Sequence, residues 1–365
     1  MKNIYIYLLT ELKKRSPLAL ATIIKTKGST PQVTGTSALF SSGGLLTGTV
    51  GGGLLEGDAQ KRALQSLQKE VSLLYTFDLN ADVSSEEGAI CGGEVTILID
   101  VHPEEHTKTF QDIGQSLSRH RPGVLATFIG RHANGKVSLT RHWIEIGDDF
   151  SVDSEILAAY QEEIRKSFAE NKPNLVEIKE KKFLKNGKET LLFLEPIYPL
   201  PNLIIAGAGH IGQAISHIGS LLDFEVTVID DRPEFANKEK FPEADHIIVD
   251  DIGKAVQDSP ISSDTYVVIV TRGHRNDADA LKQCIDSEAA YIGMIGSARK
   301  IELMRMEFLQ EGWATPAQFD RVYAPIGIDI QSKTVQEIAV SISAQLILVR
   351  RQKQKSMKEE IWSGP

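Results

Sequence analysis

The second half of the chain is dominated by short apolar runs that alternate with helix-like segments. Several runs are continuous stretches of β-branched residues, which are typical of strands buried on both faces of a parallel sheet. Because strands alternate with helices, we predict a Rossmann-type, doubly wound domain over residues 199–350. The charged residues 351–365 are expected to form a solvated tail. The candidate strands are LIIAG, EVTVIDD, HIIVDD, TYVVIVT, AYIGMIG and a sixth, RVYAPIG.

The first half of the chain lacks this regular alternation. A short amphipathic helix is expected at the start, and the prolines of PLPN indicate a linker at 199–202. Strands and helices mix without a fixed order, which indicates an α+β domain over residues 1–198. Expected elements are strands at 18–26 and 93–101, helices at 54–70, 107–119 and 153–171, antiparallel pairs at 37–53 and 123–146, and a hairpin turning at Asn186–Gly187.

Length and composition are those of an ordinary two-domain protein. A chain of 365 residues fits two domains at roughly 100–200 residues each. The net charge of -9 argues against nucleic acid as the main partner, because such proteins usually carry a basic footprint. The N-terminus lacks a signal-peptide pattern, and no apolar run is long enough for a membrane span. The two cysteines suit a reducing compartment, so a cytoplasmic location is expected.

A glycine-rich motif follows the first strand of the second half. In NLIIAGAGHIGQAI, Gly207, Gly209 and Gly212 have the G-x-G-x-x-G spacing. The motif opens a helix, and Asp230 and Asp231 end the next strand, which is the context of a dinucleotide-binding loop. The glycines would allow close approach of a pyrophosphate, and an Asp could hold ribose hydroxyls. The alternative is a Rossmann turn kept only for packing.

Polar side chains also follow the other predicted strands. Ligands of open α/β sheets bind at the carboxyl ends of the strands, so these residues should share one rim. Arg299 and Lys300 could clamp a phosphate, and His210 would face whatever lies over the glycine turn. The alternative is that many of them are helix caps, as Thr334 and Glu337 should be by their capping-box spacing. The rim residues are Thr271, His274, Asp277, Ser297, Arg299, Lys300 and Asp329.

A second glycine-rich stretch, GTVGGGLLEGD, lies in the first half. Gly51, Gly52 and Gly53 run straight into a predicted helix, whose bare N-terminal amides favour an anion. Glu56 in the first turn could accept the paired N–H donors of a pterin or purine ring. Its alternative role is to complement the helix dipole.

The two cysteines have different surroundings. Cys284 lies in a helical pattern and is expected to be a small buried hydrophobe. Cys91 lies among glycines in GAICGGEV, where a large ligand could reach the thiol. A zinc site is not indicated, because no second Cys or His lies at ligand spacing. A nucleophile is not indicated either, because no base lies nearby in the sequence. A soft thiolate for a soft metal or sulfur centre fits better.

Taken together, the motifs resemble the XdhC/CoxI family of xanthine dehydrogenase accessory proteins. They run in family order over nearly the whole chain. Each is weak alone, and the combination is specific. The motifs are KGSTPQVTG, GTVGGGLLEGD, ICGGEV, GAGHIGQA, VIDDRPEFA, FPEAD, VIVTRGHRND, YIGMIGSARK and APIGIDI.

The resemblance implies a maturation factor. Family members bind the molybdenum cofactor, a molybdopterin species, protect it, support its sulfuration with a cysteine desulfurase, and pass it to a xanthine dehydrogenase-type molybdenum hydroxylase. Homodimers are common in the family. The family cysteine matches Cys91, which places that thiol near molybdenum or its sulfido ligand. Gln32 stands where the family often has arginine, so a charge-assisted contact is lost there.

The residues expected to bind a cofactor therefore fall in both halves. They are Gly51, Gly52, Gly53, Glu56, Cys91, Gly92, Gly93, Gly207, Gly209, His210, Gly212, Asp230, Asp231, Arg232, Thr271, His274, Asp277, Ser297, Arg299 and Lys300.

Two other functions remain open from the sequence. One is an NAD(P)-dependent oxidoreductase that uses the Rossmann loop, with His274 or His210 as proton donor. The other is a scaffold that binds the hydroxylase and the desulfurase and keeps a vestigial nucleotide fold. A hydroxylase itself is excluded, because the chain is too short and lacks cysteine sets for iron–sulfur clusters.

Overall fold

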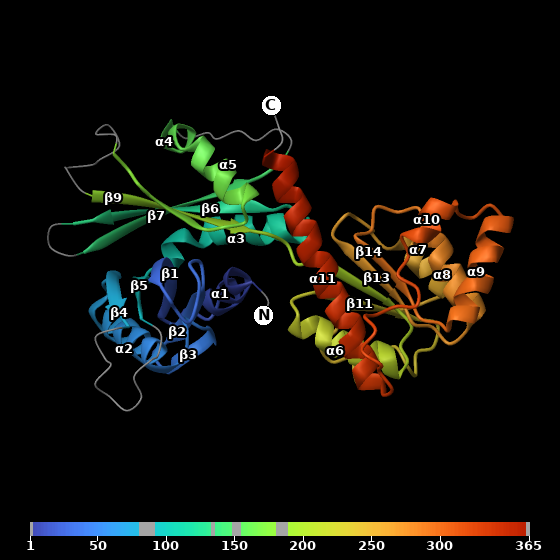
Figure 1. The fold of residues 1–365 in the computed structure, drawn as a ribbon. Coiled ribbons are helices and arrows are strands. Elements are labelled where there is room, and N and C mark those ends of the chain that lie inside the picture. Colours follow the sequence, from blue (N-terminus) through green and yellow to red (C-terminus); the bar gives the residue numbers. More distant parts are fainter. Residues whose placement is uncertain (1–2, 80–91, 133–135, 148–154, 180–188, 363–365) are drawn as a thin grey trace. The chain divides into compact units, whose positions relative to one another are not determined.

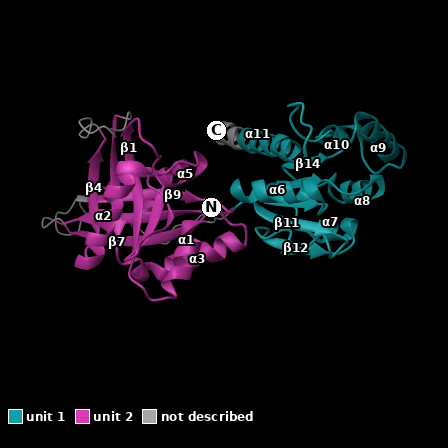
Figure 2. Ribbon diagram, turned by 90° about the horizontal axis from the view of Figure 1, so that it is seen from below, with its two compact units in different colours: residues 1, 200–365 teal, residues 2–199 magenta. Residues whose placement is uncertain are grey.

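A computed structural model describes residues 3–79, 92–132, 136–147, 155–179 and 189–362. The chain divides into two compact units, Lys2–Pro199 and, with Met1, Leu200–Pro365 (Figure 2). Each of the hydrophobic clusters lies wholly within one unit. Within the described ranges, no helix is both long and apolar enough to cross a membrane.

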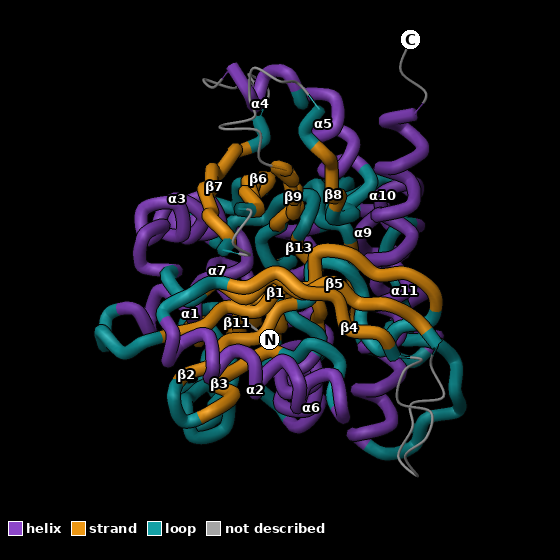
Figure 3. Tube along the Cα trace, turned by 90° about the vertical axis from the view of Figure 1, so that its left-hand side faces the viewer, coloured by secondary structure: helices purple, strands orange, loops and turns teal. Residues whose placement is uncertain are grey.

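The first unit begins with a five-stranded antiparallel sheet in the order β3-β2-β1-β5-β4. Alternate side chains of its strands, such as Ile23 and Ile97, pack on helix α2, which covers one face (Figures 1 and 3). The elements are β1 (Leu18–Gly28), β2 (Ser37–Ser41), β3 (Gly44–Gly48), α2 (Gly53–Lys69), β4 (Leu73–Asp78) and β5 (Gly93–Asp100).

A second antiparallel sheet follows, in the order β7-β6-β9-β8. Helices α4 and α5 cover its outer face through Leu157, Tyr160 and Ile164. The elements of this part are β6 (Gly123–Arg131), β7 (Val137–Glu145), α4 (Glu155–Ala159), α5 (Gln161–Ala169), β8 (Asn174–Glu177) and β9 (Glu189–Ile197).

The inner faces of the two sheets meet in the middle of the unit. Ile24 and Leu98 of the first sheet pack against Ile129 and Phe193 of the second. Beside them a further cluster joins both sheets to two helices, with Phe110 fully buried. These elements are α1 (Ile4–Leu12), the 3-10 turn η1 (Pro103–His106) and α3 (Thr107–Ser118).

The second unit is a parallel sheet in the order β12-β11-β10-β13-β14. Helices α6 and α11 cover one face, and helices α7 to α10 cover the other. This confirms the doubly wound fold. The elements are β10 (Asn202–Ala206), α6 (His210–Leu221), β11 (Glu225–Asp230), β12 (His246–Val249), α7 (Ile252–Asp258), β13 (Thr265–Ile269), α8 (His274–Cys284), β14 (Tyr291–Met294), α9 (Ala298–Gln310), α10 (Pro316–Asp320) and α11 (Val335–Trp362).

Several local expectations were wrong. The segment RVYAPIG is no strand, because Pro325 has no N–H to continue a ladder, and only the single bridge Gly293–Tyr323 forms. Helix α11 continues past residue 350 to Trp362, so the segment expected as a solvated tail is helical. Strand β4 was missed, since its side chains are only half-buried at the sheet edge. The expected turn at Asn186–Gly187 lies outside the described residues.

Candidate functional site

Three glycine-containing segments meet at one end of the first sheet. A Cβ on Gly51 would lie 2.8 Å from Cγ of Pro31. A Cβ on Gly93 would lie 2.7 Å from the carbonyl oxygen of Ser29. The loop 28–32 therefore touches both the triple glycine and the start of β5. We call residues 28–32, 51–53 and 92–93 the glycine junction.

Backbone crowding explains two glycines of the junction. The amide of Ser29 donates to the carbonyl oxygen of Gly92 at 3.2 Å. A Cβ on Gly28 would come within 2.8 Å of that same oxygen, and a Cβ on Gly93 within 2.6 Å of the carbonyl oxygen of Lys27. The missing side chains at 28 and 93 thus allow β1 and β5 to approach closely at their ends. Cys91 lies outside the described residues.

The start of α2 is open instead. Gly52 and Gly53 adopt left-handed φ values of +70° and +52°, and an added Cβ would meet no atom within 4 Å at either position. No side chain caps this helix end. Oε2 of Glu56 accepts hydrogen bonds from the Thr49 hydroxyl at 2.6 Å and from the Val50 amide at 3.3 Å. That oxygen of Glu56 therefore secures the turn before α2.

The Rossmann glycines also divide by function. A Cβ on Gly207 would lie 2.4 Å from the carbonyl oxygen of Val270, and one on Gly212 would lie 2.0 Å from the carbonyl oxygen of Gly207. These two glycines are required by the turn and by packing. Gly209, at the N-terminus of α6, has open space around it, and His210 beside it is exposed.

Asp230 is occupied by protein groups. Its buried carboxylate accepts the amide of Ala208 at 2.8 Å and both Nε and Nη2 of Arg232, at 2.8 and 3.0 Å. Burial raises the pKa of Asp230, but the hydrogen bonds from Arg232 and Ala208 outweigh burial and hold it below its ordinary value. The lone pairs expected to receive ribose hydroxyls are thus engaged. Asp231 pairs with Arg272 at 2.8 Å.

A buried ion pair lies at the ends of β13 and β14. Asp277 is fully buried and accepts the Thr271 hydroxyl at 2.6 Å. Its other carboxylate oxygen accepts a hydrogen bond from Nζ of Lys300. The structure thus brings Thr271, Asp277 and Lys300 together, as the rim expectation requires. Because the ammonium of Lys300 is paired with Asp277, Lys300 would attract an external phosphate less strongly than an unpaired lysine.

An open hollow of about 540 Å³ is lined by four of the rim residues, His274, Ser297, Arg299 and Lys300. His274 pairs there with Glu307 at 2.9 Å, and Ser297 caps α9 by accepting the amide of Lys300. Asp329 instead accepts the amide of Gln331, and the expected capping box of Thr334 and Glu337 forms. The lining residues are His274, Ser297, Arg299, Lys300, Leu303 and Glu307.

Two charged partners of this rim were missed from the sequence. Arg272, which follows β13, pairs with Asp231, which follows β11, across the end of the intervening strand β10. Glu307 reaches His274 from α9. Arg272 directly follows a predicted strand, so its position alone could have added it to the rim. Glu307 gave no signal, because it lies in the last turn of α9, away from the strand ends. Cys284 is a fully buried core residue, and burial raises its pKa to about 12.

Comparison with known proteins supports the same architecture. The model for the XdhC Rossmann domain matches residues 203–346, and the model for the XdhC and CoxI family matches residues 12–78. A crystal structure from Bacillus halodurans, described as a xanthine dehydrogenase, has a TM-score of 0.73 and 26% identity, and the alignment covers 95% of this chain and 96% of that one.

Two curated relatives differ in length. A protein of Bacillus subtilis (strain 168), described as a probable xanthine dehydrogenase subunit, is 26% identical over 96% of this chain and 98% of its own length. The uncharacterized protein YqeB of Escherichia coli (strain K12) is 23% identical over 93% of this chain, which spans 44% of that relative. With both family domains in order and the expected folds, this chain belongs to the XdhC and CoxI family.

Proposed function

We propose that this protein is an accessory factor that holds the molybdenum cofactor at its glycine junction and passes it to a xanthine dehydrogenase-type hydroxylase. Protection of the cofactor, its sulfuration with a cysteine desulfurase, and action as a homodimer belong to the same proposal. The family membership and the descriptions of the relatives support the link to xanthine dehydrogenase.

The observation that carries the proposal is the convergence of the junction. Three segments far apart in sequence meet where β5 begins, immediately after Cys91 in the chain. At the same place the helix α2 starts without a side-chain cap. Exposed amides at a helix N-terminus favour a phosphate or another anion.

The residues at the junction fit such a cofactor. Gly52 and Gly53 add no side chain into the open space before α2, where the first amides of the helix lie without a side-chain cap. These amides would hold the anionic part of the cofactor, and the thiol of Cys91 would approach its metal or sulfido ligand. The cofactor supplies the oxidation–reduction chemistry of molybdenum when bound. The chain contributes binding, orientation and exclusion of water.

The test is anaerobic loading of purified protein with molybdenum cofactor, followed by gel filtration and quantification of pterin and molybdenum. Wild type should retain both, and Cys91→Ala should retain much less. Cys284→Ala is the matched control, because Cys284 is buried in the other unit and its loss should leave loading unchanged. Absence of loading in wild type would overturn the proposal. Equal loading of wild type and Cys91→Ala would show that the thiol does not take part in binding.

A nucleotide-dependent oxidoreductase is the second candidate. The open position of Gly209 favours it, whereas the engagement of Asp230 with Arg232 weakens it. Titration of wild type and Gly209→Val with NADH and NADPH separates the two functions. Tight binding that the Val substitution abolishes, in a protein that retains no molybdenum cofactor, would favour the oxidoreductase.

A further inference from the structure

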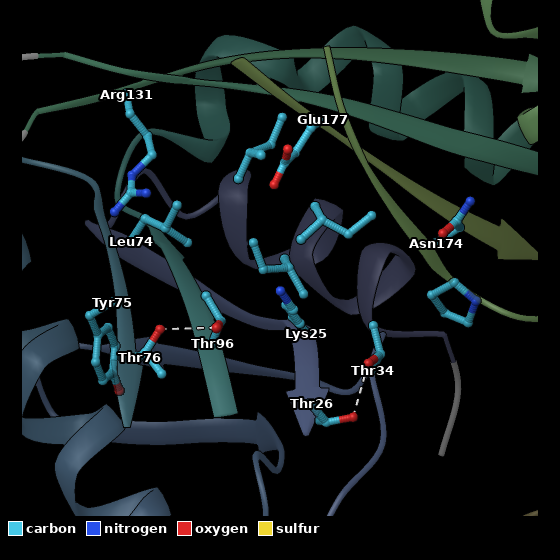
Figure 4. A pocket seen from close by; sticks show the side chains of 14 residues that line it. Lys25, Thr26, Thr34, Leu74, Tyr75, Thr76, Thr96, Arg131, Asn174 and Glu177 are labelled. Carbon is cyan, nitrogen blue, oxygen red and sulfur yellow. Dashed lines mark hydrogen bonds between the residues drawn. The ribbon is translucent and has the colours of Figure 1, made fainter. Parts of the chain in front are cut away.

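A second, separate cavity lies between the two sheets of the first unit (Figure 4). It measures about 440 Å³, within the size range of small-molecule pockets. Its walls come from β1, β4 and β5 on one side and from β6, β8 and β9 on the other. The apolar side chains of Ile24, Leu74, Leu175 and Leu191 line part of it.

The inner face of the first sheet is polar at this cavity. Lys25 pairs in register with Thr96, which pairs with Thr76, so the three residues form one row across β1, β5 and β4. The hydroxyls of Thr76 and Thr96 lie 3.0 Å apart. Inner faces of packed sheets are normally apolar, as Ile24 and Leu98 are in this unit. Lys25 and Thr76 are exposed and Thr96 is half-buried, so the cavity is open here and presents polar groups to solvent or to a ligand.

The opposite wall carries complementary groups. Figure 4 shows the carboxylate of Glu177 pointing into the cavity, with Lys25 on the facing sheet and the guanidinium of Arg131 at one side. Within the part of the chain that the structure describes, neither Lys25 nor Glu177 forms an ion pair. Lys25 and Glu177 thus bring charges of opposite sign to one space.

We propose that this cavity binds a small metabolite that carries both an anionic group and N–H donors. Lys25 and Arg131 would hold the phosphate or carboxylate through charge-assisted hydrogen bonds. Glu177 would accept the N–H donors, and the threonine hydroxyls would bind the polar remainder. The site is separate from the glycine junction, so the proposal goes beyond the function proposed above.

Two probes distinguish the sources of the anionic group. Adenosine 5′-monophosphate supplies a phosphate with an amino group, and a mixture of the standard amino acids supplies a carboxylate with an ammonium. Binding is measured by calorimetry and by the rise in melting temperature of the full chain at millimolar ligand. We expect one probe to bind saturably, and both Lys25→Ala and Glu177→Gln to weaken it about tenfold or more.

Neighbouring residues provide matched controls. Lys27 lies on the same strand, outside the cavity, and pairs with Glu94. Lys27→Ala and Glu94→Gln should therefore leave binding unchanged, although each removes the same kind of charge from the same unit as the cavity variants. Circular dichroism checks that every variant is folded. Failure of both probes to bind wild type, or equal losses in the cavity and control variants, would overturn the proposal and leave the cavity as a solvated gap.

Discussion

Single glycines in the Rossmann turn serve different purposes, although the sequence motif treats them alike. Gly212 has no space for a side chain, since its Cβ would lie 2.0 Å from a backbone oxygen. Gly209 has open space and an ordinary φ of -73°. The motif spacing predicted the turn. The crowding at Gly212 comes from the carbonyl oxygen of Gly207 within the turn, whereas the crowding at Gly207 comes from Val270 after β13. The second contact joins residues far apart in the chain, so the motif alone does not record it.

This difference gives a stability prediction. Gly212→Ala should lower the free energy of unfolding by about 1–3 kcal/mol or more, because a backbone oxygen cannot move aside as a flexible side chain can. Gly209→Ala should cost about 1 kcal/mol at most, because alanine is only a poorer N-cap than glycine at this open position. Urea unfolding of the two variants checks this, and equal losses would contradict the packing argument.

A buried carboxyl in the first unit should make stability depend on pH. Burial raises the pKa of Glu195 to about 7, although the hydrogen bond from Tyr5 and the charge of Arg141 lower it. The folded state thus keeps a proton that the unfolded state loses above its usual pKa near 4.5. The contribution of Glu195 to the free energy of unfolding is therefore fully present below about pH 4.5 and is lost as the pH rises to about 7.

Glu195→Gln tests this linkage, because an amide can still accept the Tyr5 hydroxyl without titrating. The stability of wild type relative to the Gln variant should fall between pH 4.5 and pH 7, by up to about 3 kcal/mol. Urea unfolding at several pH values measures the difference. A difference independent of pH would show that Glu195 does not titrate in this range.

At the scale of elements, helix α11 shows how one helix completes a domain. Ala339, Ile342 and Leu346 are fully buried against the Rossmann sheet, and Arg350 donates to the carbonyl oxygen of Leu222 at 2.8 Å. The charged residues after 350 predicted a tail. They extend the helix instead, because Lys, Arg, Glu and Gln have high helix propensity and continue a helix already fixed by packing.

Two leucines on α11 give a matched test. Leu346 is 0% exposed, whereas Leu348 is 47% exposed. Leu346→Ala should cost about 2–5 kcal/mol through lost burial and a cavity, and Leu348→Ala less than about 0.5 kcal/mol. Thermal or urea unfolding measures both. Similar effects would show that α11 does not pack as described.

At the scale of the whole molecule, the two units have separate cores. Every hydrophobic cluster lies on one side of Pro199. We therefore propose that residues 1–199 and 200–365 fold independently. Each fragment, expressed alone, should unfold cooperatively in calorimetry with native-like circular dichroism. A molten or insoluble fragment would indicate that its core needs the other half.

Local spacing and periodicity were enough to predict the Rossmann class, the glycine turn and the capping box at Thr334. The family came from the resemblance of the motifs taken together. Tertiary structure alone decided which atoms those residues meet. The carboxylate of Asp230 accepts a hydrogen bond from Arg232. Lys25 and Glu177 lie on two different sheets and line the same cavity. Contacts between residues far apart in the chain depend on how sheets pack, and no local pattern in the sequence records that packing.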